Sequence, residues 1–247
     1  MKKLIISFIA LAFFLNSCTD GSGGVSATDG TLTGQGGSLA RFVVVKDYLY
    51  IVDGQNLKLF NLNDPSNPVY LSNSDLNVNV ETIFARDSAT SFIGTTSGMF
   101  IYDISNPPNV NLISSYSHIV SCDPVVANSK YAYVTLHSDL NNQFCARNIN
   151  QLDIVNIEQL SQPFIVNSFP LIKPLGLGLY GDTLLICDNG VKVFNVKDPN
   201  NLQLINAIED IPAVDIIPSG DLMIISSTEG IKQYRYKNGS LNLLSEI

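Results

Sequence analysis

Hydrophobic and polar residues alternate with a period of two from residue 39 to the end of the chain. Gly, Pro, Asn and Asp interrupt this alternation every few residues, and no stretch keeps a helical period over successive turns. Alternation of this kind places apolar side chains on one face of a strand, and the interruptions mark turns. The pattern therefore predicts an all-β domain built from short strands.

These strands fall into five sets of four that can be superposed. The third strand of each set carries a large apolar residue near its centre, at Phe60, Tyr102, Leu152, Phe194 and Tyr234. The spacings are 42, 50, 42 and 40 residues, and a period near forty with four strands is typical of propeller blades. The sequence thus predicts a single β-propeller of five four-stranded blades over residues 39–247, with these five side chains packed between blades.

The repeats also predict how the ring closes and where it departs from regularity. Each repeat supplies its own four strands, so we expect blade 1 to pack against blade 5 without a strand from the N-terminal segment. The long spacing places an insertion, residues 137–148, in the third repeat. A polar proline turn follows the third strand at Asp64-Pro65, Asn106-Pro107 and Asp198-Pro199. The third repeat is interpreted as having lost this turn.

Four segments of these repeats resemble one known family. They are Tyr48–Gly54, Leu59–Pro68, Phe100–Pro108 and Val193–Pro199, and they resemble the LVIVD repeat of bacterial surface and periplasmic propellers. The resemblance covers roughly residues 40–247 and implies a propeller fold in an exported, non-enzymatic protein. The family shares no catalytic residues, so the resemblance assigns none to this chain.

The N-terminus predicts export and lipid anchoring. Two lysines precede an apolar run, Leu4–Leu15, which is too short to span a bilayer and is typical of a signal peptide. The run leads into Cys18 through small polar residues, which resembles the bacterial lipobox. We therefore expect a signal peptide over 1–17, lipidation of Cys18 and a Gly/Ser/Thr-rich flexible tether over 18–38. Thr19 differs from the Asp that marks inner-membrane retention, which favours the outer membrane.

Charge and motif context argue against several ligand classes. The formal net charge is −8, which opposes binding to nucleic acid and to anionic lipids. Gly176–Gly181 matches the dinucleotide pattern G-x-G-x-x-G, but a strand follows where that site requires a helix N-terminus. The two histidines, His118 and His137, have no cluster of metal ligands near them in sequence. We therefore expect no cofactor and no metal.

Three cysteines follow Cys18. Export favours oxidation, and Cys122 lies at the start of the third blade while Cys145 lies in the insertion of that blade. The sequence predicts a disulfide between these two residues. Cys187 lies within an apolar strand and is expected to be a buried small hydrophobic residue.

One group of charged residues shares a place in the repeat. Arg41, Glu81, Asp123 and Asp215 open the first strands of four blades, so we expect them to meet at one mouth of the central channel. Such a group forms either a solvated ring or a site for a cation or small polar ligand. If the acids converge, their repulsion should raise the pKa of at least one carboxyl group.

Two classes of function remain open. The first is a non-enzymatic binding or scaffold module of the cell envelope, with a protein or glycan as its partner and the lipid as its membrane contact. The alternative is a hydrolase or lyase with its site at the channel mouth, which requires a general base with a partnered nucleophile or a metal. The sequence shows no such group and favours the binding module.

Overall fold

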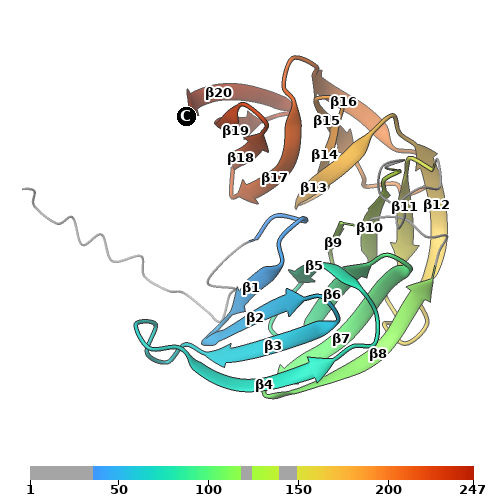
Figure 1. The fold of residues 1–247 in the computed structure, drawn as a ribbon. Coiled ribbons are helices and arrows are strands. Elements are labelled where there is room, and N and C mark those ends of the chain that lie inside the picture. Colours follow the sequence, from blue (N-terminus) through green and yellow to red (C-terminus); the bar gives the residue numbers. More distant parts are fainter. Residues whose placement is uncertain (1–35, 118–123, 139–148) are drawn as a thin grey trace, which may run out of the picture.

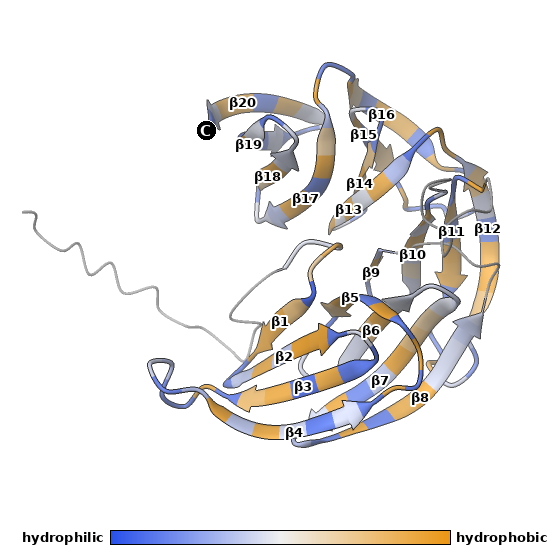
Figure 2. Ribbon diagram, in the orientation of Figure 1, coloured by the Kyte–Doolittle hydropathy of each residue, from blue (hydrophilic) through white to orange (hydrophobic). Residues whose placement is uncertain are grey.

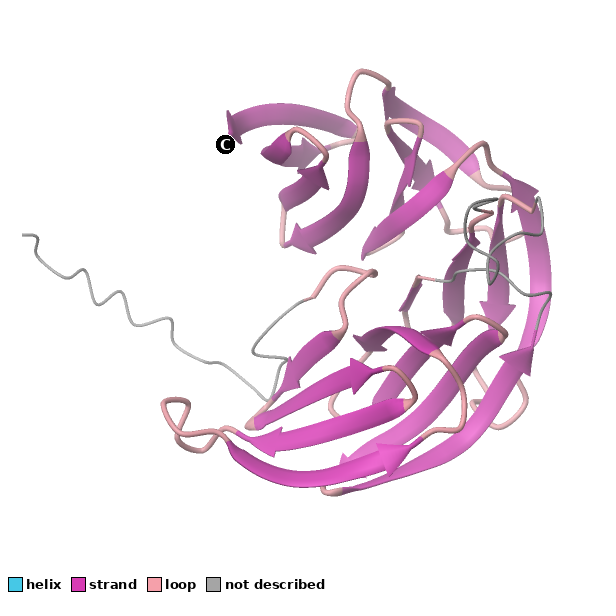
Figure 3. Ribbon diagram, viewed as in Figure 1, coloured by secondary structure: helices cyan, strands magenta, loops and turns pink. Residues whose placement is uncertain are grey.

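The computed structural model describes residues 36–117, 124–138 and 149–247. In these ranges the chain forms β-strands and no helix (Figure 3). The strands form five four-stranded antiparallel sheets, each in sequence order, and the sheets surround a central axis with the first strand of each innermost (Figure 1). The predicted five-bladed all-β propeller is confirmed.

Each blade takes four consecutive strands. The twenty strands are β1 (Phe42–Val45), β2 (Tyr48–Asp53), β3 (Asn56–Asn61), β4 (Val69–Asp75), β5 (Val80–Ala85), β6 (Thr90–Thr95), β7 (Gly98–Asn106), β8 (Asn109–Ser117), β9 (Val125–Ala127), β10 (Tyr131–Leu136), β11 (Gln151–Asn156), β12 (Phe164–Pro170), β13 (Pro174–Tyr180), β14 (Thr183–Asp188), β15 (Val191–Asn195), β16 (Gln203–Ile208), β17 (Ala213–Ser219), β18 (Leu222–Ser227), β19 (Gly230–Lys237) and β20 (Ser240–Glu246).

The core lies between neighbouring blades, because both faces of a blade carry apolar side chains and one sheet cannot bury them alone. Apolar and polar residues alternate along the strands (Figure 2), and the buried apolar residues of the strands come from the first three strands of each blade. They form four clusters, one at each junction between consecutive blades. Fully buried members of the four clusters are Tyr50 and Ile83 between blades 1 and 2, Phe92 and Val134 between blades 2 and 3, Ile154 and Leu184 between blades 3 and 4, and Leu185 and Ile225 between blades 4 and 5.

A β-bulge recurs where the third and fourth strands of every blade pair, with the extra residue on the fourth strand, and it corrects the alignment of the third repeat. The third-strand residues that come directly after this shift in pairing are Phe60, Tyr102, Val155, Phe194 and Tyr234. Val155, and not Leu152, is therefore the equivalent position in blade 3. Leu152 is still buried, but it packs toward blade 4, whereas Val155 packs toward blade 2. The inserted residues between β10 and β11 caused the misalignment.

The turn after the third strand is also kept in blade 3, contrary to the sequence interpretation. The amide of Gln162 donates to the carbonyl of Gln159 at 2.9 Å, as the amide of Asn67 donates to the carbonyl of Asp64 at 3.0 Å. Leu160 takes the position of Pro65, since each follows the first residue of its turn. Hydrogen bonding thus maintains the turn where the proline is missing.

The junction between blades 5 and 1 differs from the other four. None of the apolar clusters formed by the described residues joins these two blades, and Phe42 on β1 is 57% exposed. Direct packing of blade 1 on blade 5 was the wrong expectation. The segment before β1 makes the connection instead, because Ser38 and Leu39 donate hydrogen bonds to Asp215 of β17. Figure 1 shows this segment between β1 and the inner strands of blades 4 and 5.

Candidate functional site

A cleft of about 430 Å³ lies where blade 5 meets blade 1. Its walls come from the segment before β1, from β1 itself, and from β17 and β18. The lining residues are Gly36, Gly37, Leu39, Ala40, Phe42, Val43, Val44, Val214, Asp215, Ile217 and Ser226. Among these, Asp215 is the sole ionisable residue and Ser226 the sole hydroxyl. An apolar pocket of this size with few convergent polar groups is the usual form of a small-molecule site.

Asp215 lies near the start of β17, where a bulge precedes it. Asp215 is 9% exposed. Oδ1 accepts hydrogen bonds from Ser38 Oγ at 3.0 Å and from the Ile216 amide at 2.9 Å. Oδ2 accepts one from the Leu39 amide at 3.2 Å. The carboxyl group is therefore held from both sides in a residue that lines the cleft.

Burial raises the pKa of the Asp215 carboxyl group, and the hydrogen bonds from Leu39, Ser38 and Ile216 oppose that shift without cancelling it. A carboxyl group with a raised pKa is a stronger base when ionised and a proton donor when neutral. Among the residues that the structure describes, no other acid contributes to the shift. The sequence predicted a raised carboxyl pKa through repulsion between acids, and the cause at Asp215 is burial instead.

Ser38 positions this carboxylate. It is 1% exposed, and while its Oγ donates to Asp215 it also accepts a hydrogen bond from the Leu177 amide at 2.7 Å. Through these two hydrogen bonds Ser38 links the segment before β1 to β13 of blade 4 and to β17 of blade 5. The sequence interpretation missed this residue because it assigned Ser38 to the flexible tether over 18–38. The Gly/Ser composition of that segment contains no signal that would have distinguished it.

Two glycines leave room for the Asp215 side chain. A Cβ atom at Gly37 would lie 2.0 Å from Oδ2, and one at Gly176 would lie 2.1 Å from Oδ1. Both approaches are far inside van der Waals contact, so neither position accepts a side chain without moving the carboxylate. Gly176 belongs to the segment that matches the dinucleotide pattern, yet it lies in β13. Its role here is close packing.

The structure places the other predicted channel-mouth residues differently from Asp215. Thr82 pairs with Gly94 as Asp215 pairs with Ser226, so Thr82 is the equivalent position in blade 2. Glu81 is half-buried in the bulge one residue earlier, and a shift of one residue turns a side chain to the other face of a strand. Asp123 lies outside the described residues.

Arg41 precedes β1 and is exposed. Its positive charge helps lower the pKa of Asp53, after the larger effect of the hydrogen bond from Lys58. Of the three predicted residues that the structure describes, Asp215 lines the cleft and Arg41 and Glu81 do not. Convergence of all four at one mouth stays a prediction, because Asp123 is not described.

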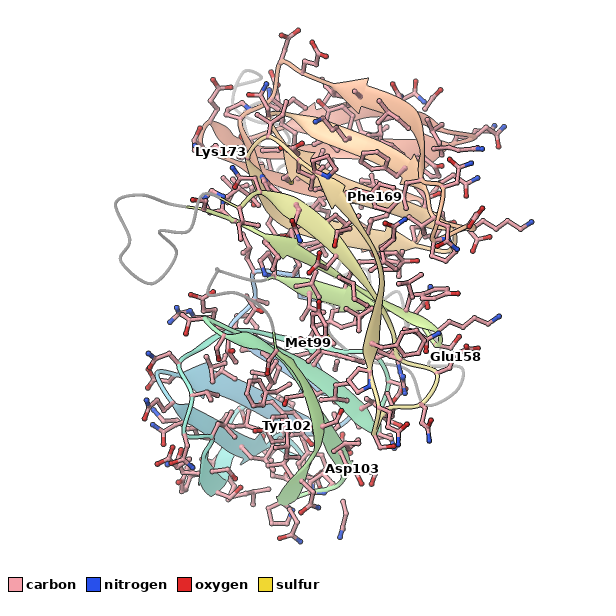
Figure 4. All side chains as sticks on the ribbon, turned by 90° about the vertical axis from the view of Figure 1, so that its right-hand side faces the viewer. Met99, Tyr102, Asp103, Glu158, Phe169 and Lys173 are labelled. Carbon is pink, nitrogen blue, oxygen red and sulfur yellow. The ribbon has the colours of Figure 1, made fainter. Side chains whose placement is uncertain are left out.

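The two faces of the ring can be distinguished in side view. Lys173 precedes β13 and Glu158 follows β11, and the two lie on opposite faces (Figure 4). The first strands start at the Lys173 face, so Asp215, which lies near the start of β17, belongs to that side. The cleft continues along β1 and β17 to Val44 and Ile217.

Several other expectations concern cysteines, metals and the membrane. Cys187 is buried, as predicted, and has a free thiol. Cys18, Cys122 and Cys145 lie outside the described residues, so lipidation and the disulfide stay predictions. Within the described ranges, no group of three or more His, Cys, Asp or Glu residues is arranged to hold a metal ion. The same ranges contain no helix long and apolar enough to cross a membrane.

Comparison with known proteins finds similarity in structure and none in sequence. No protein-family model matches the chain, and no curated protein sequence matches it. A protein of unknown function from Desulfotomaculum acetoxidans is similar, with a TM-score of 0.67, 13% identity, and coverage of 83% of this chain and 68% of the other. The periplasmic gluconolactonase PpgL of Pseudomonas aeruginosa has a TM-score of 0.58, 12% identity, and coverage of 81% and 67%.

A protein of Bacteroides uniformis, provisionally assigned as a 6-phosphogluconolactonase, has a TM-score of 0.61, 10% identity, and coverage of 83% and 69%. These neighbours contradict the interpretation of the chain as a non-enzymatic binding or scaffold module, because two of the three are described as lactonases. They favour the hydrolase alternative. At this identity the likeness shows the propeller fold alone, so an activity for this chain is a proposal.

Proposed function

We propose that the protein is a hydrolase that opens lactone rings in the cleft between blades 5 and 1. The observation that carries the proposal is Asp215, which lines a largely apolar cleft and whose carboxyl group has a pKa raised by burial. A titratable group with such a perturbation in a pocket is a candidate for acid–base catalysis. The lactonases among the structural neighbours support the choice of reaction.

The chemistry requires one general base and one water molecule. Ionised Asp215 takes a proton from the water as the water oxygen attacks the lactone carbonyl carbon. The ring carbon–oxygen bond then breaks, and the protonated Asp215 returns that proton to the leaving alkoxide. The products are one hydroxy acid and the regenerated carboxylate. Ser226 lines the cleft, and its hydroxyl donates a long hydrogen bond of 3.5 Å to the backbone carbonyl of Asp215. In the proposed reaction this hydroxyl turns away from that carbonyl and donates instead to the lactone carbonyl oxygen as negative charge develops there.

The test is hydrolysis of δ-valerolactone by the purified protein, followed as acid release with the uncatalysed rate subtracted. Asp215→Asn keeps the size of the side chain and removes the base, so we expect kcat to fall by about 10²–10⁴-fold. Ser226→Ala should lower kcat by about 10²-fold.

Asp153→Asn is the matched control. Asp153 is also buried, at 2% exposure, but it lies on β11 and bonds to Gln151, Ser168 and Tyr116. This variant should retain activity if it folds, which circular dichroism checks. Lactone hydrolysis that survives in Asp215→Asn would overturn the proposal.

We further propose that the enzyme acts at the cell envelope, anchored through Cys18. The signal-peptide pattern over 1–17 and the lipobox-like residues before Cys18 support this location. Replacement of Cys18 by Ser should move the protein from the membrane fraction to the soluble fraction after cell disruption. Unchanged membrane association in Cys18→Ser would contradict lipid anchoring.

A further inference from the structure

The composition of the cleft bears on which lactones it can bind. None of the described residues that line it is Lys, Arg or His. Its single ionisable group is an acid, and the whole chain carries a formal charge of −8. A phosphorylated lactone would bring a dianion toward Asp215 with no cation to pair it, and burying an unpaired charge is costly.

A sugar lactone meets a related difficulty. Each of its hydroxyl groups gives up hydrogen bonds to water on binding and needs a protein partner in return, since an unsatisfied buried polar group costs free energy. The described lining offers two polar side chains, Asp215 and Ser226. The proposed reaction already uses both of them at the reacting carbonyl. Few side-chain partners are left for ring hydroxyls.

The walls of the cleft suit an apolar group instead. Phe42 and Val44 face it from β1, while Val214 and Ile217 face it from β17. Phe42 is 57% exposed, although the other four junctions between blades are filled by apolar clusters. An apolar substituent on the substrate would cover this surface and remove it from water, which is favourable in proportion to the area buried.

We propose that the substrate is an uncharged lactone with an alkyl or aryl substituent, and that this substituent packs on Phe42 and Ile217. The inference rests on the proposed function, because it assigns a substrate class to the same site. It separates the chain from the sugar-lactone activities named for its structural neighbours. The distinction comes from the lining residues and not from the fold.

The test compares δ-lactones of increasing alkyl length, from δ-valerolactone to δ-decalactone, with glucono-1,5-lactone. We expect kcat/KM to rise by about fourfold for each methylene that becomes buried, and then to level off when the cleft is filled. Glucono-1,5-lactone should be a poorer substrate than δ-valerolactone. A flat alkyl series, or a preference for the sugar lactone, would overturn the inference while leaving the hydrolase proposal intact.

Two variants link the preference to the cleft. Phe42→Ser should reduce the ratio of kcat/KM between δ-decalactone and δ-valerolactone by about tenfold, because part of the apolar wall is lost. Phe164→Ser is the matched control: Phe164 is 58% exposed on the outer strand β12, so the ratio should not change. An unchanged ratio in Phe42→Ser would contradict the assigned position of the substituent.

A binding measurement separates the inference from the hydrolase proposal. In Asp215→Asn, which lacks the base, δ-decalactone should raise the melting temperature more than δ-valerolactone at equal concentration. If no lactone is hydrolysed in an Asp215-dependent manner, the hydrolase proposal fails, whereas this preferential stabilisation would still support an apolar ligand. Equal or absent stabilisation by the two lactones would overturn the inference.

Discussion

Ser38 and Asp215 are 177 positions apart in sequence, yet the Ser38 hydroxyl donates a 3.0 Å hydrogen bond to the Asp215 carboxyl group. Ser38 also accepts a hydrogen bond from the Leu177 amide. This one buried side chain therefore connects the segment before β1 to blades 4 and 5, at the junction where no apolar cluster of described residues joins the blades.

Ser38→Ala should lower the free energy of unfolding by about 1–3 kcal/mol, because it leaves the buried Leu177 amide without its partner and removes one hydrogen bond from Asp215. Chemical denaturation would measure the change. Ser66→Ala is the control, since Ser66 is exposed and bonds only within its own turn, to Asp64. A loss at Ser66 equal to that at Ser38 would argue against a linking role.

The same variant should move the pH dependence of catalysis. The Ser38 hydrogen bond lowers the pKa of Asp215, against the larger effect of burial. Its removal should raise that pKa further, so the acidic limb of the kcat/KM profile should shift to higher pH. Ser38→Thr keeps the hydroxyl and should restore the original profile if its extra methyl group is accommodated. A purely structural role for Ser38 would lower stability without moving the limb.

Stability should depend on pH through Asp215. Its pKa is raised in the folded state, so between the unfolded and folded values the folded protein binds the proton more strongly. This contribution is fully present below the unfolded pKa of 3.8 and is lost as pH rises through the folded pKa. The slope is at most about 1.4 kcal/mol per pH unit. Denaturation curves from pH 4 upward should show the decline in wild type and a flatter profile in Asp215→Asn.

The sequence predicts the fold well because the blade pattern is local. Alternation over short strands, proline turns and a period near forty all lie within single repeats, and they place all five blades. The misalignment in the third strands, Leu152 in place of Val155, arose where an insertion interrupts the period. Asn61 and Asn156 occupy equivalent positions at the ends of β3 and β11, and each accepts a hydrogen bond from the backbone amide two residues later. Alignment of the repeats on these two Asn residues would have made Val155 the equivalent of Phe60.

The candidate site was harder to predict because it joins the two ends of the fold. Asp215 was identified from its place in the repeat, but its burial depends on Ser38 and on Gly37, which lie in a segment of low-complexity composition. Glu81, which lies in the bulge of β5 one residue before Thr82, was grouped with Asp215 because a bulge of one residue cannot be read from alternation. Contacts between the N-terminal segment and blade 5 depend on ring closure, which local patterns do not encode.

Gly176→Ala should be destabilising and should also disturb the site. The added Cβ would lie 2.1 Å from Oδ1 of Asp215, so the carboxyl group or β13 must move. Overpacking of this kind costs about 1–3 kcal/mol. Gly54→Ala offers a comparison, because a Cβ there meets no atom within 4 Å and only its positive φ of 64° opposes the change. Lactone hydrolysis should fall in Gly176→Ala and stay at the wild-type level in Gly54→Ala.

The three cysteines after Cys18 should comprise one unreactive thiol, Cys187, and one disulfide, between Cys122 and Cys145. Burial raises the pKa of the Cys187 thiol, with a smaller contribution from the negative charge of Asp215, so the native protein should not react with a maleimide at this residue at neutral pH. Unfolding should expose it. If Cys122 and Cys145 form the predicted disulfide, unfolded and unreduced protein that lacks Cys18 should take up one label. Three labels under those conditions would contradict the disulfide.

Asp188 should contribute more to stability than any exposed acid of the ring. It is fully buried and accepts hydrogen bonds from the Ile172 and Lys173 amides and from the Lys192 ammonium group. Asp188→Ala would leave these donors without their acceptor where the chain passes from blade 3 to blade 4, at a cost of about 3 kcal/mol.

Asp53 forms a comparable ion pair with Lys58, but its side chain is 65% exposed. Solvent already screens this pair, so Asp53→Ala should change the denaturation midpoint little. The two variants remove the same side chain and the same charge, which makes the difference in midpoint a measure of burial. Equal midpoints for Asp188→Ala and Asp53→Ala would show that the crossover between blades 3 and 4 does not depend on Asp188.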